Sequence, residues 1–281
     1  MSTNQNDAVL REWRESAAYW RKHCGTIRTM FSPVTHALIK EAGIVEGHSV
    51  LDVAGGAGEP SLTIAEIVGP KGSVTCTDAV AEMVVTAQNE GQRRELTNVV
   101  FRQCAADSLP FESESFDVTV SRLGAMFFPD PLVALREMLR VTKSGGAISL
   151  VVWGESELNP FSYLITNVVT RYCEVAPADP NVPGAFRFAQ AGALAQILRE
   201  AGANEVKERV LKFHIEAPIS LEQFWEMRSE TSETLRKKLA SLSPPQAELL
   251  AQEAREAVRE FFSNNQMSIP AQMIIVTARK P

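Results

Sequence analysis

Between residues 49 and 153, short apolar segments alternate with segments of helical periodicity, and this alternation restricts the fold more than any other feature of the sequence. Strands are predicted at residues 49–54, 73–77, 99–104, 116–121 and 147–153. Helices are predicted between them at residues 60–68, 79–92 and 131–141. A β–α succession of this kind predicts a Rossmann-like, doubly wound α/β fold, with a mostly parallel sheet and helices on both faces.

The segments on either side of this stretch add strands and helices to the sheet. Two further strands, at residues 206–216 and 273–278, bring the expected sheet to seven strands. Residues 1–46 are predicted as an N-terminal helical cap with a turn at Gly25, ahead of a core over residues 47–281.

Within that core, residues 155–190 and 217–266 are predicted as helical lid and insertion segments. Their helices are expected at residues 160–173, 189–201, 221–239 and 244–262. Segments added to an open α/β sheet often cover the crevice at the carboxyl ends of its strands. We therefore expect them to carry the substrate specificity.

Charge and cysteine spacing exclude several classes of partner. The chain has 28 Lys and Arg residues against 34 Asp and Glu residues, a net charge of −6, which disfavours nucleic acid. The polar N-terminus and the lack of a run of about 18 apolar residues predict a cytoplasmic protein with no membrane span. No CxxC pair or metal-ligand spacing accompanies the cysteines, so we expect no metal site and reduced thiols at Cys24, Cys76, Cys104 and Cys173.

The first predicted strand runs into a glycine-rich turn, residues 54–58, that opens the next helix. Glycine lets a ligand approach the backbone, and the helix N-terminus offers N–H groups to an anion. A nicotinamide site prefers G-x-G-x-x-G, but counting from Gly56 the third glycine is replaced by Ser61. Asp52, ahead of the turn, instead suits an ammonium group such as that of S-adenosylmethionine.

Acidic residues follow the next two predicted strands. Asp78 can accept both hydroxyls of a ribose, although a helix N-cap is the alternative role. Asp107 can accept from an adenine amino group while Met83 or Leu109 packs on the ring. Because the carboxyl ends of parallel strands share one edge of a sheet, these side chains and the glycine turn predict a single adenosyl-binding crevice.

With residues 116–118, 134–141 and 143–146, this pattern resembles the class I S-adenosylmethionine-dependent methyltransferases. Over about residues 45–155 the chain is most similar to the ubiquinone/menaquinone-biosynthesis type and related small-molecule enzymes. The resemblance implies S-adenosyl-L-methionine as cofactor, S-adenosyl-L-homocysteine as product and a small-molecule acceptor. Ser121-Arg122 and Ser144 differ from the Arg-Asn pair and the proline of the quinone enzymes, which argues against a quinone precursor.

The resemblance also assigns residues to each part of the cofactor. The methionyl part would lie at Asp52 and the glycine turn, the ribose at Asp78, the adenine at Met83 and Asp107, and the methyl-transfer site at Arg122. The full set of implied cofactor-binding residues is Asp52, Ala54, Gly55, Gly56, Gly58, Asp78, Ala79, Met83, Ala106, Asp107, Ser121 and Arg122. Ala54 stands where the family usually has glycine.

The expected function is methyl transfer to a small aromatic or lipophilic metabolite, with C- or O-methylation favoured. Displacement at a sulfonium methyl depends chiefly on alignment and on exclusion of water. A hydroxyl acceptor would need a base, for which His23 and His36 are candidates, with Arg122 as an electrostatic aid. Aromatic residues that could line a lid over a flat acceptor are Trp13, Tyr19, Trp20, Phe127, Phe128, Trp153, Phe161, Phe186, Phe188 and Trp225.

Two other functions remain open from the sequence alone. One is a nicotinamide-dependent oxidoreductase on a similar fold, and the other is a non-catalytic S-adenosylmethionine-binding regulator or scaffold. The fold is compatible with each of these functions. A sealed pocket would indicate catalysis, whereas an open apolar surface would indicate a partner protein. A homodimer is a further possible assembly.

Overall fold

The computed structural model describes residues 3–172 and 182–281, so Cys173 and most of the connection that follows it lie outside the described residues. Its sheet has the strand order β3-β2-β1-β4-β5-β8-β6. These strands are β1 (Ser49–Val53), β2 (Ser73–Asp78), β3 (Val99–Gln103), β4 (Phe116–Arg122), β5 (Thr142–Trp153), β6 (Asn204–Ala217) and β8 (Gln266–Arg279).

The first five strands pair in parallel, and β8 pairs antiparallel with both β5 and β6. The predicted α/β class with a mostly parallel sheet is therefore confirmed. A two-residue strand, β7 (Phe262–Ser263), also pairs with β8 and makes the sheet eight-stranded instead of seven-stranded. It is the start of a tight hairpin through Asn264 and Asn265, whose backbone φ angles of 51° and 55° suit a two-residue turn.

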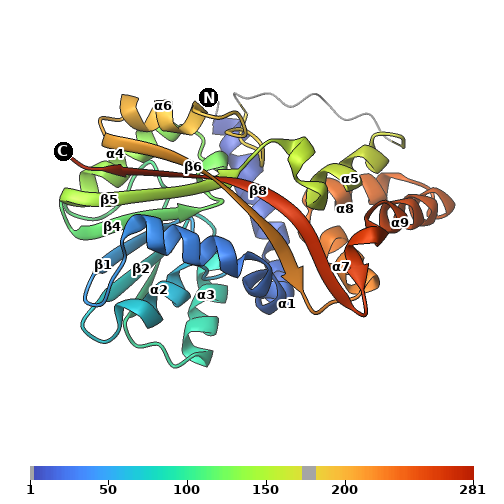
Figure 1. The fold of residues 1–281 in the computed structure, drawn as a ribbon, viewed down its shortest axis with the longest axis horizontal. Helices are drawn as coiled ribbons and strands as arrows, with labels where there is room; N and C mark the ends of the chain where they lie inside the picture. The colour runs from blue at the N-terminus through green and yellow to red at the C-terminus, as the bar shows by residue number, and fades with distance from the viewer. Residues whose placement is uncertain (1–2, 173–181) are drawn as a thin grey trace.

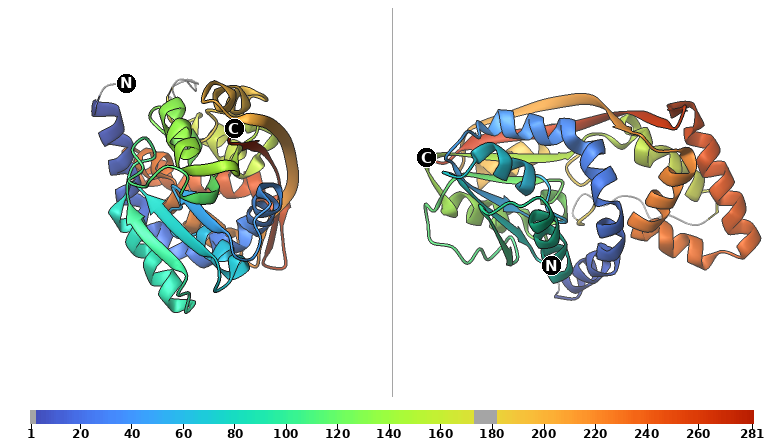
Figure 2. Two further views of the ribbon diagram at one scale, coloured as in Figure 1. Left: turned by 90° about the vertical axis from the view of Figure 1, so that its left-hand side faces the viewer. Right: turned by 90° about the horizontal axis from the view of Figure 1, so that it is seen from below.

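Helices cover the two faces of the sheet. Figures 1 and 2 show α4 (Pro131–Val141) and α6 (Ala193–Glu200) on one face, and α2 (Ser61–Val68) and α3 (Ala81–Arg93) with part of α1 (Thr3–Ala42) on the other. In α4, Asp130 accepts from the Val133 N–H at 3.1 Å and Pro131 occupies the first turn, as a helix start requires. The Leu135 and Met138 side chains of the same helix are fully buried in the core.

The N-terminal segment is one helix, so the predicted turn at Gly25 is wrong. An interior glycine costs a helix only about 1 kcal/mol, and the apolar face continues through this position. Figure 2 shows α1 bending along its length, and Pro33 lies inside it. Met30, Val34 and Leu38 are each at most 1% exposed and belong to the same core as the sheet.

Long strands carry the added helices away from the sheet. Figure 1 shows β6 and β8 extending beyond the other strands to a lobe that contains α5 (Pro160–Val169), α7 (Leu221–Thr231), α8 (Glu233–Ser241) and α9 (Pro244–Val258). Short 3-10 turns lie at Ala125–Phe127, Ser156–Leu158 and Arg259–Phe261. None of the helices within the described ranges is long and apolar enough to cross a membrane.

Several predicted boundaries are wrong, since β8 begins at Gln266 instead of residue 273 and α6 begins at Ala193 instead of residue 189. Two further differences change the pattern of elements. The single helix expected over residues 221–239 is divided at Ser232, which has extended backbone and caps α8 by accepting from the Leu235 N–H at 3.4 Å. Strand β5 begins at Thr142, because the pairing with β4 starts there and shifts register between Phe116 and Val118. The Gly145-Gly146 segment is thus inside the strand as an irregularity.

Candidate functional site

A cavity of about 250 Å³ opens at the carboxyl ends of β1, β2 and β4 and beside the loop that follows β3. We call it the strand-end cavity. Nine of the twelve residues expected at the cofactor line it, namely Ala54, Gly55, Gly56, Asp78, Ala79, Met83, Ala106, Asp107 and Arg122. Asp52, Gly58 and Ser121 do not line it. The strand ends therefore converge as the parallel topology requires.

The glycine turn is held against β2 by its own backbone. The Gly55 N–H donates to the Thr77 carbonyl at 2.8 Å, and the Gly56 N–H donates to Asp78 Oδ2 at 3.0 Å. Ala54 has a φ of +59°, in the left-handed region that normally favours glycine. The turn thus keeps the shape that a glycine would give, at the expense of strain in Ala54.

Asp52 lies beneath this turn instead of inside the cavity. Its side chain is fully buried, and Oδ2 accepts from Ser61 Oγ at 2.6 Å and from the Ser61 N–H at 3.2 Å. Oδ1 has no hydrogen-bond partner among the described residues. Burial raises the pKa of Asp52 to about 7. Asp52 consequently links the end of β1 to the start of α2 and stabilises the glycine turn between them.

Asp78 both shapes the cavity and faces it. Oδ2 accepts from the Gly56 N–H, and Oδ1 accepts from the Val80 N–H at 2.9 Å. Burial raises the pKa of this carboxyl group as well. A carboxylate oxygen accepts more than one hydrogen bond, so both oxygens retain capacity for the hydroxyls of a ribose. These two acceptor oxygens therefore fit the ribose of an adenosyl ligand.

Arg122, the last residue of β4, lines the cavity and is held in place by two hydrogen bonds. Its Nη1 donates to Thr35 Oγ1 at 2.7 Å and its Nη2 donates to the Glu59 carbonyl at 3.1 Å. Burial lowers the pKa of this guanidinium, although Glu59 and Asp52 oppose the effect. The preceding Ser121 is fully buried, and its Oγ has no partner in the part of the chain that the structure describes. Arg122 thus places positive charge on the cavity wall.

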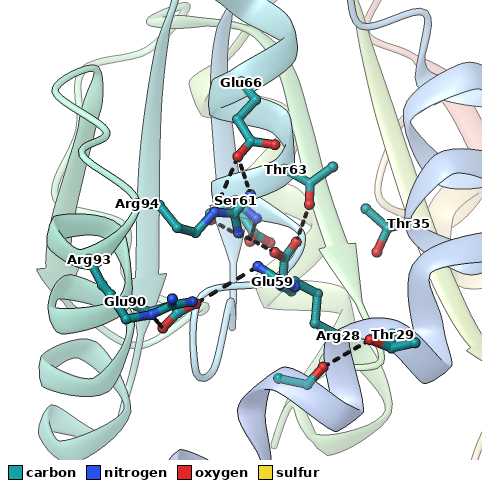
Figure 3. Close-up of polar contacts among 12 residues, drawn as sticks. Arg28, Thr29, Thr35, Glu59, Ser61, Thr63, Glu66, Glu90, Arg93 and Arg94 are labelled. Atoms are coloured by element: carbon teal, nitrogen blue, oxygen red, sulfur yellow. Dashed lines mark hydrogen bonds and ion pairs between the residues drawn. The ribbon is translucent and has the colours of Figure 1, made fainter. Parts of the chain in front are cut away.

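Sequence reasoning missed Glu59, which follows the glycine turn directly and lines the cavity. Figure 3 shows its carboxylate held by Arg94 Nη1 at 2.6 Å and by Thr63 Oγ1 at 2.7 Å. Arg94 in turn contacts Glu66 at 2.6 Å. The sequence signal for Glu59 was its position, because it lies between the glycine turn and the start of α2, where a side chain can reach a ligand bound by the turn.

The two histidine candidates lie away from the cavity. His23 Nε2 lies 2.6 Å from Glu230 Oε2 and ties α1 to α7, and His36 contacts the Ser32 carbonyl at 2.8 Å on the exposed side of α1. Neither histidine lines a cavity at this site. Their predicted catalytic role therefore gains no support from their positions.

A second cavity of about 320 Å³, which we call the aromatic chamber, adjoins the first. Six of the ten predicted lid aromatics line it, namely Trp13, Trp20, Phe127, Trp153, Phe161 and Phe186. The residues common to both cavities are Trp13, Trp20, Ile27, Phe31, Leu123 and Phe127. Since the cavities share these six lining residues, they lie next to each other.

Similarity to known proteins agrees with this geometry. A model of the ubiE/COQ5 methyltransferase family matches residues 34–218. The chain is 35% identical over 127 residues to the ubiquinone/menaquinone biosynthesis C-methyltransferase UbiE of Bdellovibrio bacteriovorus, which covers 45% of this chain and 53% of that protein. It is 40% identical over 114 residues to the uncharacterized methyltransferase YcgJ of Bacillus subtilis, covering 41% of this chain and 44% of that protein. The chain thus spans about half the length of these curated relatives.

The fold is also found among solved structures. The crystal structure of the YcgJ protein from Bacillus subtilis superposes with a TM-score of 0.55 and 23% sequence identity, covering 88% of this chain and 97% of that one. At this level of identity the likeness concerns the fold.

Proposed function

Because this chain belongs to the ubiE/COQ5 methyltransferase family, we propose that it transfers a methyl group from S-adenosylmethionine to a small aromatic or lipophilic acceptor. The observation that carries this proposal is the pair of adjoining cavities. One has acidic side chains and the glycine turn at the strand ends, and the other has aromatic walls next to the added helices. The first suits an adenosyl ligand and the second suits a flat acceptor.

Each part of the cofactor has a matching group in the strand-end cavity. Asp78 would accept from the ribose hydroxyls, and Asp107 and Met83 would contact the adenine. The backbone of the glycine turn, which carries no side chain at Gly55 or Gly56, would lie against the methionyl part. Glu59, which also lines the cavity, is the carboxylate available to the methionyl ammonium group. This role replaces the one that the sequence assigned to Asp52.

S-adenosylmethionine, when bound, supplies a methyl group on its sulfonium. The acceptor nucleophile would form a bond to this methyl carbon while the carbon–sulfur bond breaks, and S-adenosylhomocysteine would leave. The protein holds the acceptor in line and excludes water, which together provide most of the acceleration. The aromatic walls of the chamber perform both tasks. The C-methyltransferase name of the Bdellovibrio relative supports carbon as the acceptor atom.

Calorimetric titration of the purified protein with S-adenosylmethionine, S-adenosylhomocysteine and NADH tests the cofactor. We expect micromolar binding of both adenosyl ligands and none of NADH. Phenolic, quinone-like and polyketide acceptors are then screened by product mass for a gain of one methyl group. Binding of NADH alone would favour an oxidoreductase, whereas adenosyl binding with no product from any acceptor would favour a regulator or scaffold.

A further inference from the structure

One charged side chain, Arg228 of α7, lines the aromatic chamber. Its guanidinium carbon lies 4.5 Å from the centroid of the Phe161 ring. Nε is buried and has no hydrogen-bond partner, and no ion pair reaches the guanidinium within residues 3–172 and 182–281. Burial lowers the pKa of Arg228 to about 10. The chamber therefore contains a cation that has no counter-charge among the residues that the structure describes.

The acidic residues near Arg228 are engaged elsewhere. Glu230 binds Lys22 at 2.8 Å and His23 at 2.6 Å, and Glu233 pairs with Lys237. No Asp or Glu among the described residues lines the chamber. No acidic group in the described part of the chain thus neutralises Arg228, and an anion that enters the chamber from outside would do so.

The physical properties of the site select the kind of group. A buried charge without a partner is unfavourable, and pairing relieves that cost. The planar guanidinium matches a carboxylate through two parallel N–H donors. Ser232 and Thr234, at the N-terminus of α8, also line the chamber, and the partial positive charge there favours an anion. The ring of the ligand would meet Trp153, Phe161 and Phe186.

We propose that Arg228 binds the carboxylate of an aromatic acid that occupies the aromatic chamber as the methyl acceptor. The proposal rests on the proposed function, since it identifies the chamber as the acceptor site. Arg122 is a less suitable partner, because both of its terminal nitrogens already donate to Thr35 and Glu59. Arg228 therefore acts as a specificity-determining residue that separates acids from neutral aromatic molecules.

The test compares two probes of nearly equal shape, 2-naphthoate and 2-naphthamide, by calorimetric titration at pH 7, where the carboxylate is ionised. The wild-type protein, with S-adenosylhomocysteine present, is expected to bind naphthoate roughly tenfold or more tightly than naphthamide. Arg228→Met should abolish this preference. Arg259→Met makes the same change of charge on an exposed side chain that pairs with Glu256, and should keep the preference.

Arg228→Lys retains the charge without the planar fork and should show an intermediate preference, which also serves as the comparison if the methionine variant does not fold. A wild-type protein that binds both probes alike, or neither, contradicts the proposal, as does a preference that survives in Arg228→Met. Titration with S-adenosylhomocysteine alone distinguishes a failure of the proposed function from a failure of the role proposed for Arg228. Its failure would count against the proposed function, whereas normal binding without probe discrimination would count only against the role of Arg228.

Discussion

The strand-end cavity and the aromatic chamber adjoin each other but are assembled in different ways. The strand-end cavity takes its polar groups from short stretches at the ends of neighbouring strands, where Asp78 and the glycine turn contact each other directly. The chamber takes its walls from α1, α5, α7, α8, the end of β5 and two connecting segments. The difference shows that residues close to the strand ends determine the polar groups of the strand-end cavity. The lining of the chamber instead depends on how segments far apart in the sequence pack together.

Helix α1 contributes to both cavities, and truncating it is expected to produce the largest effect. Removal of residues 1–40 takes away Met30, Val34 and Leu38, which are fully buried against the sheet. Burial of each such side chain contributes about 1.5–3 kcal/mol, which together approaches the whole stability of a domain. We expect this truncation to unfold the protein, as measured by circular dichroism.

Removal of residues 1–21 provides the matched control. It deletes Trp13 and Trp20, which line both cavities, but keeps the buried half of α1. We expect a folded protein with impaired ligand binding. The two truncations differ only in residues 22–40, so equal melting behaviour would show that these residues do not stabilise the core.

The pH dependence of stability should come largely from the strand-end region. The pKa of Asp52 in the folded protein is raised to about 7, above the unfolded value of about 3.9, so the folded state binds more protons between these values. Its contribution is most favourable at low pH and is lost as pH rises through about 7, with Asp78 acting in the same direction.

Urea unfolding at pH 5 and pH 8 measures this effect. The wild-type free energy of unfolding is expected to receive a contribution of a few kcal/mol from Asp52 that disappears towards pH 8. Asp52→Asn remains neutral throughout and should show a weaker pH dependence. An unchanged slope in that variant would mean that Asp52 does not carry the raised pKa.

Asp78→Ala should affect ligand binding in the strand-end cavity but not in the aromatic chamber, because Asp78 lines only the former. Loss of two hydrogen bonds from ribose hydroxyls to a charged acceptor is expected to weaken S-adenosylhomocysteine binding by at least about 100-fold, since each is worth about 1.5–3 kcal/mol. Asp117→Ala, at the opposite end of β4, should leave the affinity unchanged. Calorimetry measures both variants, and an unaltered affinity in Asp78→Ala would remove this residue from the proposed site.

The smallest expected effect concerns strain in the glycine turn. Ala54 has a φ of +59°, so Ala54→Gly should relieve backbone strain and stabilise the protein by about 0.5–1 kcal/mol. Ala57 lines the same cavity but is not among the residues with a positive φ, and Ala57→Gly should give no such gain. Thermal melting compares the two. Destabilisation by Ala54→Gly would show that its methyl contact outweighs the strain.

Much of the strand-end cavity could be predicted because its residues follow strands that are recognisable from the sequence. Even there, Asp52 was expected beside the ligand but lies under the turn, since its side chain hydrogen-bonds to Ser61. The sequence also contains a signal for Arg228, which is a charged residue at a position expected to be buried. It falls seven residues after Leu221 and four after Phe224, on the apolar stripe of α7.

The sequence by itself determined the parallel sheet, the order of its elements and the meeting of Asp78, Asp107 and the glycine turn, because local periodicity and the topology of parallel strands require them. Only the tertiary structure decided that α1 passes Gly25 without a turn and that His23 pairs with Glu230. It also decided that Arg228 lies over the Phe161 ring with no ion-pair partner among the described residues. These features depend on contacts between segments up to about 200 residues apart. No local pattern encodes such contacts, since packing selects them only when the chain has folded.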